Sequence, residues 1–115
     1  MRQGLAFLFL VLGFSSLAAA QQGTSNIQGR AIDGQGGALP GVVVIVTHEG
    51  TGLVRETQTG ADGAYSVPNL VAGSYTVTAE LTGFRKLNLE KLLLTAGLTV
   101  TQDLNLQIGA LEETL

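Results

Sequence analysis

The 115-residue chain contains no cysteine, no tryptophan and a single histidine, His48. Without cysteine it can form no disulfide and carry no lipid on a cysteine, so its stability must come from apolar packing. Zinc sites normally recruit several His or Cys ligands, or two His and a carboxylate, and His48 alone cannot supply either set. These absences exclude a disulfide-rich scaffold, a lipoprotein and a zinc hydrolase.

Positive charge is also scarce. Beyond residue 20 the chain has five basic residues against nine acidic ones, a net charge of −4. Only Arg85 and Lys86 are adjacent to each other. Nucleic acid and anionic lipid surfaces both require concentrated positive charge, so neither is expected as a partner.

Motifs for catalysis or cofactor binding are missing as well. No serine lies on a Gly-x-Ser-x-Gly turn that could serve His48, which is expected to be structural or solvent-facing. Asp62 has only Thr59 nearby as a side-chain helper, whereas calcium needs six or more oxygen ligands. The glycines of residues 34–37 precede no helix and cannot form a phosphate-binding loop. We therefore predict no catalytic, metal-binding or cofactor-binding residues, no cofactor and no enzymatic activity.

The first 20 residues have the three parts of a cleaved secretory signal peptide. Arg2 supplies the positive charge, residues 5–14 form a short apolar core, and Ala18 and Ala20 occupy the small-residue positions before Gln21. A transmembrane helix needs about 20 apolar residues, so the segment is too short to span a membrane. An uncleaved anchor is the alternative. We expect residues 1–20 to be removed and the remaining chain to leave the cytoplasm.

Beyond residue 20 the apolar residues repeat with period two, the period of a β-strand with one buried and one wet face. The clearest case is residues 98–108, where the even-numbered positions are apolar except Gln102. Residues 75–81 follow the same scheme. Together with five less regular segments, these give seven candidate strands, at residues 27–32, 42–48, 53–59, 64–67, 75–81, 84–94 and 98–108.

Two of these strands carry further information. Residues 42–46 are apolar at every position, which places them in the centre of a sheet. In residues 84–94 the leucines change parity, and a bulge near Glu90 and Lys91 would reconcile the two halves. The turn signals between strands are Asp33-Gly34, Pro40-Gly41, Asp62-Gly63 and the reversal between Asn69 and Gly73.

Antiparallel strands with frequent turns and no room for a long helix predict an all-β protein, a seven-stranded antiparallel β-sandwich. The predicted divisions are the signal peptide at residues 1–20, a linker at 21–26, the sandwich at 27–108, and at 109–115 a tail or the start of a linker to a missing domain. Tyr65, Tyr75 and Phe84 are each expected in the core. That would leave no exposed aromatic platform on which a sugar could stack.

An ordered set of short motifs resembles the carboxypeptidase regulatory-like domain. In the first half it comprises Gly29-Arg30-Ala31 with Asp33, then Leu39-Pro40-Gly41-Val42. In the second half it comprises residues 59–63 with Tyr65, residues 67–70, residues 73–77 and Gly83-Phe84. The resemblance spans residues 27–106. It implies a transthyretin-like sandwich in a superfamily grouped with carbohydrate-binding folds, with no catalytic residues of its own.

The order of signal peptide, sandwich and tail is similar to the N-terminal extension of TonB-dependent outer-membrane receptors. The resemblance implies an exported accessory domain in the periplasm or outer membrane of a Gram-negative bacterium, with a protein partner in the envelope. It is expected either as a fragment of such a receptor, which would meet the membrane only through a barrel these residues do not contain, or as a stand-alone protein. The alternative is a polysaccharide-binding module. The binding residues are unknown, and the loops at residues 33–39 and 49–52 are the expected contact surfaces.

Overall fold

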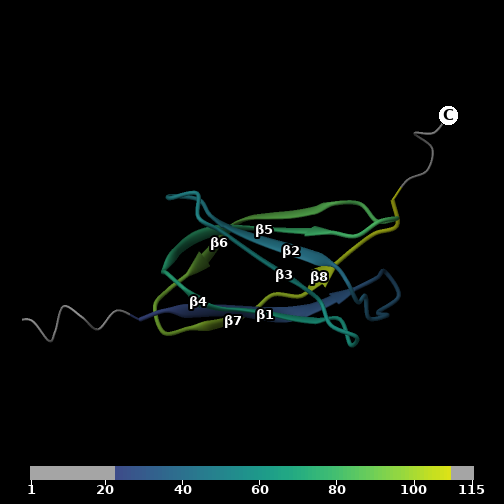
Figure 1. Cartoon of the computed structure of the whole chain (residues 1–115), viewed down its shortest axis with the longest axis horizontal. Helices are drawn as coiled ribbons and strands as arrows, with labels where there is room; N and C mark the ends of the chain where they lie inside the picture. Colours follow the sequence, from purple (N-terminus) through teal and green to yellow (C-terminus); the bar gives the residue numbers. More distant parts are fainter. Residues whose placement is uncertain (1–22, 110–115) are drawn as a thin grey trace, which may run out of the picture.

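The computed structural model describes residues 23–109. The predictions for the signal peptide, its cleavage site and the last six residues therefore fall outside the described part of the chain. Eight strands form two sheets that pack face to face (Figure 1). The strands are β1 (Ser25–Ile32), β2 (Val43–His48), β3 (Val54–Gln58), β4 (Ala64–Leu70), β5 (Gly73–Glu80), β6 (Leu87–Leu94), β7 (Thr99–Thr101) and β8 (Leu104–Asn105).

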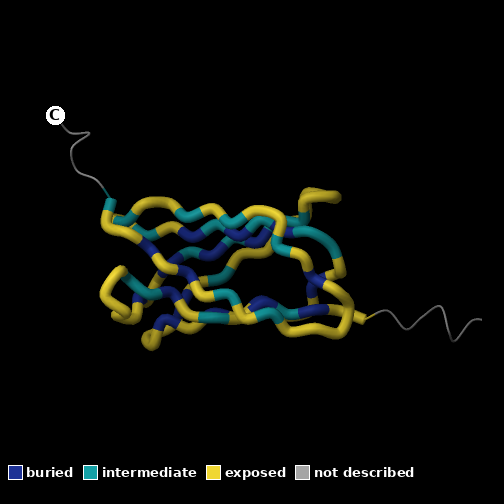
Figure 2. The backbone as a smooth tube through the Cα atoms, turned by 180° about the vertical axis from the view of Figure 1, so that it is seen from behind, coloured by how far each residue is buried: buried dark blue, intermediate teal, exposed yellow. Residues whose placement is uncertain are grey.

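One sheet has the order β4-β1-β7, with β8 also pairing with β1, and the other has the order β3-β2-β5-β6. This architecture confirms the predicted all-β sandwich. The alternation along the strands explains it, because one parity of each strand faces the space between the sheets (Figure 2). The largest fully buried apolar side chains are Ile27, Val42, Val44, Val46, Val77, Leu94, Leu104 and Leu106. The segment that is apolar at every position forms β2, between β3 and β5, as predicted.

The last predicted strand is interrupted. Residues 98–108 form β7 and β8, which are separated at Gln102 and Asp103. Both pair with β1 in parallel, so the expectation of purely antiparallel pairing is wrong here. The ends of the segment also leave the core, because Leu98 and Ile108 are 52% and 73% exposed. Gln102 was the one polar residue in the apolar row, and it marks the interruption.

Close packing against β1 accompanies the interruption. A Cβ atom added to Gly29 would lie 2.1 Å from the carbonyl oxygen of Gln102 and 3.1 Å from the ring of Tyr65. The Gln102 amide donates to the Gln28 carbonyl at 2.7 Å, and the Arg30 amide donates to the Asp103 carboxylate at 3.1 Å. Only glycine therefore fits at this point of β1.

The predicted bulge in the sixth strand is confirmed. The register between β5 and β6 shifts at this point, and Lys91 has a positive φ of 60°. The carboxylate of Glu49, from the turn after β2, accepts hydrogen bonds from the Lys91 amide at 2.8 Å and the Thr76 hydroxyl at 2.9 Å. A side chain from one turn thus satisfies the amide that the bulge removes from regular pairing.

A second bulge lies in β4. The register between β1 and β4 shifts between Ser25 and Ile27, opposite Asn69, whose φ is also 60°. The Asn69 amide donates to the side-chain oxygen of Asn26 at 3.0 Å. The sequence had marked Asn69 as part of a reversal, and the structure places it at a bulge just before the connection to β5.

Candidate functional site

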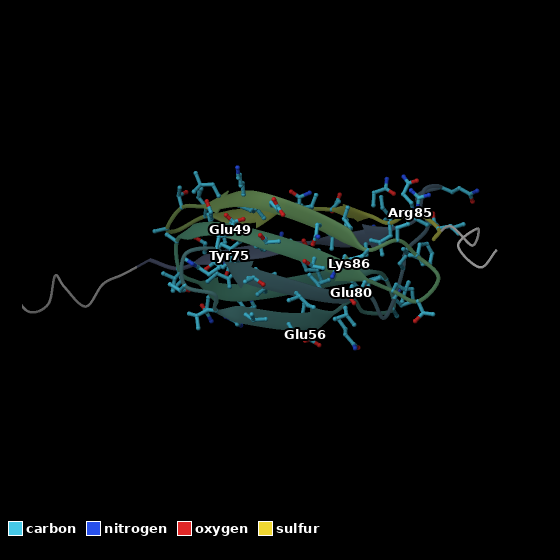
Figure 3. The ribbon with its side chains drawn as sticks, turned by 90° about the horizontal axis from the view of Figure 1, so that it is seen from above. Glu49, Glu56, Tyr75, Glu80, Arg85 and Lys86 are labelled. Carbon is cyan, nitrogen blue, oxygen red and sulfur yellow. The ribbon has the colours of Figure 1, made fainter. Side chains whose placement is uncertain are left out.

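The titratable side chains of the described residues do not converge. Within residues 23–109 no group of three or more His, Cys, Asp or Glu side chains is placed to hold a metal ion. The single ion pair joins Lys86 to Glu80 at 3.6 Å on the sheet surface, among the residues that the structure describes (Figure 3). No helix in residues 23–109 is long and apolar enough to cross a membrane.

His48 has a structural position at one end of the sandwich. Its Nδ1 atom accepts hydrogen bonds from the amides of Gly50 and Thr51, both at 3.1 Å. The ring proton therefore belongs on Nε2, which lies 3.4 Å from the Ala72 carbonyl oxygen. The ring also packs edge-to-face on Tyr75, with centroids 4.9 Å apart. His48 ties the turn after β2 to the connection before β5, in line with the structural role expected for it.

Two of the aromatic predictions are confirmed and the third is confirmed in part. Tyr65 and Tyr75 are buried, and Phe84 is half-buried against the core. The Tyr65 hydroxyl donates to the Gln102 carbonyl at 2.5 Å, and the Tyr75 hydroxyl donates to the Val71 carbonyl at 2.5 Å. Burial raises the pKa of the Tyr65 phenol, and the nearby Asp103 carboxylate adds to the effect. These rings are packing elements with satisfied hydroxyls.

The two loops expected as contact surfaces lie at opposite ends of the sandwich and are held by side-chain hydrogen bonds. In residues 33–39 the Asp33 carboxylate accepts bonds from the amides of Gln35 and Gly37, at 2.8 and 2.9 Å. These bonds lower the pKa of Asp33, the one from Gly37 having the larger effect. Residues 49–52 are held by His48 and Glu49 as described above. Both loops are exposed except at Asp33, which is half-buried, and Leu39, which is buried.

A depression lined by several polar residues lies on the outer face of the β4-β1-β7 sheet, although more of its lining surface is apolar than polar; we call it the polar depression. It has a volume of about 800 Å³. Ser66, Gln28 and Thr101 form one row across it, because Gln28 pairs with Ser66 on one side and Thr101 on the other. Arg30 and Asp103 add charged groups beside that row. The depression offers hydrogen-bond donors and acceptors, but the aromatic ring beneath it, that of Tyr65, is buried.

Exposed apolar side chains gather at one end of the sandwich. The described chain exposes six large apolar side chains, and five of them lie at the end where β2, β4 and β6 finish and where β3, β5 and β7 begin. We call this set the apolar end; its members are Leu53, Val54, Val71, Leu93 and Leu98. Ile108 lies at the opposite end, next to Phe84. Figure 1 shows the two ends, with the coloured ribbon starting at the first and finishing at the second.

The apolar end is not predictable from the sequence pattern. Its members come from the ends of β3 and β6 and from connections, and they lie at the same end only because the strands that hold them run between the same two ends. Leu93 carried the one visible signal, because it falls on the wet parity after the predicted bulge and is 63% exposed. For Leu98 the pattern pointed the wrong way, because its parity in residues 98–108 predicted a buried side chain.

Comparison with known families decides what kind of domain this is. The carboxypeptidase regulatory-like domain matches residues 26–107, nearly all of the described chain. The chain belongs to this family. The regulatory-like domain is a non-catalytic fold, and its match covers both sheets. A comparison with curated proteins gave no match.

Solved structures share the regulatory-like domain's fold at low identity. A putative carbohydrate binding protein from Bacteroides uniformis is 20% identical, with a TM-score of 0.59 over 73% of this chain and 41% of that one. The group B streptococcus pilus 2b backbone protein is 18% identical, with a TM-score of 0.56 over 83% of this chain and 44% of that one. Hydroxyquinol 1,2-dioxygenase from Pseudomonas putida is 11% identical, with a TM-score of 0.62 over 78% of this chain and 58% of that one.

The chain thus spans less than two thirds of each of these three proteins. At such identities the likeness establishes the sandwich fold alone, and the functions of the three proteins differ from one another. The function of this regulatory-like domain must therefore be argued from its own surface.

Proposed function

We propose that this protein is an exported, non-catalytic accessory domain that makes protein contacts in the envelope of a Gram-negative bacterium. The observation that carries the proposal is the apolar end, five exposed apolar side chains gathered at one end of a regulatory-like sandwich. Exposed apolar surface that a partner can cover is typical of an interaction site, and this end of the domain carries most of the large exposed apolar side chains of the described residues. The solvation cost of the cluster falls when a partner covers it. The pilus protein with the same fold is consistent with such modules working by contact.

Substitutions at the apolar end and at the opposite end of the sandwich test the proposed protein contact. Leu53 and Val71 lie in connections, so replacing both by aspartate leaves every strand intact. The variant Leu53→Asp/Val71→Asp should lose co-purification with its partner from solubilised envelope of the source organism. Ile108→Asp is the matched control, because Ile108 is even more exposed, at 73% against 66% for Leu53, but lies at the opposite end. Equal loss in both variants, or retention in both, would contradict the proposal.

Export rests on the signal-peptide pattern of residues 1–20. Full-length protein expressed in a Gram-negative host should appear in the periplasmic or outer-membrane fraction. N-terminal sequencing of that product should begin at Gln21. An unprocessed product that stays in the cytoplasmic fraction would remove this part of the proposal, while a processed product in the medium would relocate the domain outside the cell.

We further propose that the domain forms the N-terminal extension of a TonB-dependent outer-membrane receptor, with a stand-alone protein as the alternative. The support is the order of export signal and regulatory-like sandwich. Sequencing the DNA beyond codon 115 separates the two versions. An open frame that continues into several hundred codons supports the receptor. A stop codon with no receptor frame nearby supports the stand-alone protein.

Polysaccharide binding is the second candidate function. The observation that favours it is the polar depression with its row of Ser66, Gln28 and Thr101, together with the shared fold of the putative carbohydrate binding protein. Sugar hydroxyls would bond to this row, without a stacked aromatic ring. A glycan array probed with residues 21–115 tests it. Binding that is lost in Gln28→Ala supports this function, and a blank array removes it.

A further inference from the structure

The outer edge of β3 has free backbone groups. The His48 amide donates to the Leu53 carbonyl at 2.8 Å, and the Thr59 amide donates to the Val42 carbonyl at 3.0 Å. One bond lies just before the start of β3 and the other just after its end. They fix which residues of β3 bond to β2, because in an antiparallel pair the backbone N–H and C=O groups of successive residues point alternately toward the partner strand and away from it. The residues whose N–H and C=O groups face away from β2 are Val54, Glu56 and Gln58.

No other strand of the described chain pairs with that edge. β3 has a single partner, β2, and its register with β2 is continuous over five residue pairs. All five residues except Thr57 are exposed. Figure 3 shows Glu56 on the outermost strand of this sheet. The edge therefore offers three donors and three acceptors at regular spacing, the template that another extended chain can pair with.

The other edges of the sandwich are interrupted. β6 bulges at Lys91, where the backbone has a positive φ and Glu49 already binds the amide. β4 contains Pro68, which has no N–H, and bulges at Asn69. β7 and β8 are three and two residues long and separate at residues 102–103. Bulges, proline and short strands are devices that prevent edge pairing, and β3 has none of these three; the protective feature that it does carry is charge, at Arg55 and Glu56.

We propose that β3 is the docking edge, and that an extended segment of a partner protein adds to it as a fifth strand. This proposal rests on the proposed function, because it names the part of the surface that takes the protein partner. Main-chain hydrogen bonds to the three outward-facing residues would supply affinity, and side chains on both faces of the added strand would supply specificity. Val54 belongs both to the edge and to the apolar end, so a partner strand on β3 would also reach this member of the apolar end.

The charges on β3 argue against a second copy of this chain as the occupant. Antiparallel pairing of two β3 edges that uses all three outward-facing residues places Glu56 opposite Glu56 of the other copy. A shift of that register toward Val54 places Arg55 opposite Arg55. A shift toward Gln58 avoids both like-charge pairs but leaves Val54 without a strand partner. Like charges directly opposite each other destabilise a strand pair. A different sequence is therefore favoured.

The same charges specify the partner strand. The exposed Glu56 carboxylate takes part in no ion pair within residues 23–109. Arg55 is already engaged, because its guanidinium donates to the carbonyls of Pro68 and Asn69 at 3.0 and 3.4 Å. The partner strand should therefore carry lysine or arginine opposite Glu56, since opposite charges across a strand pair stabilise it.

Peptide titration of ¹⁵N-labelled residues 21–115 tests this proposal. The probe is the acetylated, amidated peptide Thr-Thr-Val-Lys-Val-Thr-Thr, and the control is the same peptide with glutamate in place of lysine. The lysine peptide should shift the amide signals of β3 and slow amide exchange at Val54, Glu56 and Gln58. Its affinity should exceed that of the glutamate peptide by about two- to fivefold, from one charge pair. In Glu56→Lys the preference should reverse.

A proline substitution gives an independent measurement. Glu56→Pro removes an N–H group that faces away from β2, so it should abolish peptide binding while leaving the β2 ladder intact. If this variant does not fold, the charge reversal in Glu56→Lys still decides the question.

Three results would overturn the assignment: shifts centred on β4, β6 or β7, equal affinity for both peptides, or concentration-dependent protection of β3 without peptide. The last would make a second copy the occupant. Failure here is separable from failure of the proposed function. A domain that co-purifies with an envelope partner through Leu53 and Val71 but ignores both peptides keeps its function and loses only the β3 assignment.

Discussion

The side chain of Thr59, just after β3, holds the loop that precedes β2 in place. Its buried hydroxyl donates to the Leu39 carbonyl at 2.6 Å and accepts from the Val42 amide at 2.9 Å. Its backbone amide donates to the Val42 carbonyl at 3.0 Å. One threonine therefore satisfies polar groups of the chain on both sides of the turn at Pro40 and Gly41.

Thr59→Val should destabilise the fold, because it keeps the shape but leaves the Val42 amide and the Leu39 carbonyl without this partner. A buried polar group left unsatisfied costs about 1–3 kcal/mol. Urea unfolding followed by circular dichroism measures the difference. Thr101→Val is the control, since Thr101 is exposed on β7 and should change stability by less than about 0.5 kcal/mol. An equal effect of the two substitutions would contradict this role of Thr59.

Glu49 makes stability depend on pH. The hydrogen bond from the Lys91 amide, and next the one from the Thr76 hydroxyl, hold the pKa of Glu49 below its ordinary value. A carboxylate with a lowered folded-state pKa stabilises the fold above its unfolded pKa, and this contribution is lost as the pH falls through the folded value. The midpoint temperature of thermal unfolding should therefore fall as the pH is lowered below the ordinary pKa of glutamate.

Glu49→Gln should flatten that acid dependence and lower the midpoint at neutral pH. Thermal unfolding across the acidic range measures both. Glu56→Gln, which removes an exposed carboxylate without such bonds, is the control and should leave the slope unchanged. A slope unaffected by Glu49→Gln would show that the bulge does not depend on the ionised carboxylate.

Among the elements, β1 is the most constrained, because it pairs with β4, β7 and β8. Gly29→Ala would force a Cβ atom to within 2.1 Å of the Gln102 carbonyl oxygen, which belongs to the backbone and cannot rotate away. We expect a loss of about 1–3 kcal/mol or more in the free energy of unfolding, as for overpacked cores. Gly34→Ala is the matched control, because nothing lies within 4 Å of its Cβ position. Comparable stability of the two variants would contradict the close approach.

The two bulges differ in how far the sequence predicts them. The spacing of the leucines predicts the β6 bulge, because their parity changes at Glu90 and Lys91. The β4 bulge has no such signal, because Pro68 and Asn69 also fit a simple turn. The interruption between β7 and β8 showed only as Gln102 in an apolar row. Their parallel pairing with β1 could not be predicted, since local alternation is the same for parallel and antiparallel neighbours that bury one face.

For the whole molecule, alternation and turn residues were enough to predict the sandwich, because one buried face per strand leaves few other ways to pack. The candidate surface was not predictable in the same way. Leu53, Val71 and Leu93 are far apart along the chain, and nothing local indicates that they lie at the same end of the sandwich. The availability of β3 is likewise a property of the sheet order, since its sequence resembles that of any polar edge strand.

Photo-crosslinking in living cells of the source organism tests the central claim most directly. A benzoylphenylalanine residue placed at Leu53 is compared with one placed at Ile108, both exposed apolar positions at opposite ends of the sandwich. We predict a discrete adduct with one envelope protein from position 53 and none from position 108. No adduct from either position, or the same adducts from both, would contradict the account of this domain as a protein-contact module.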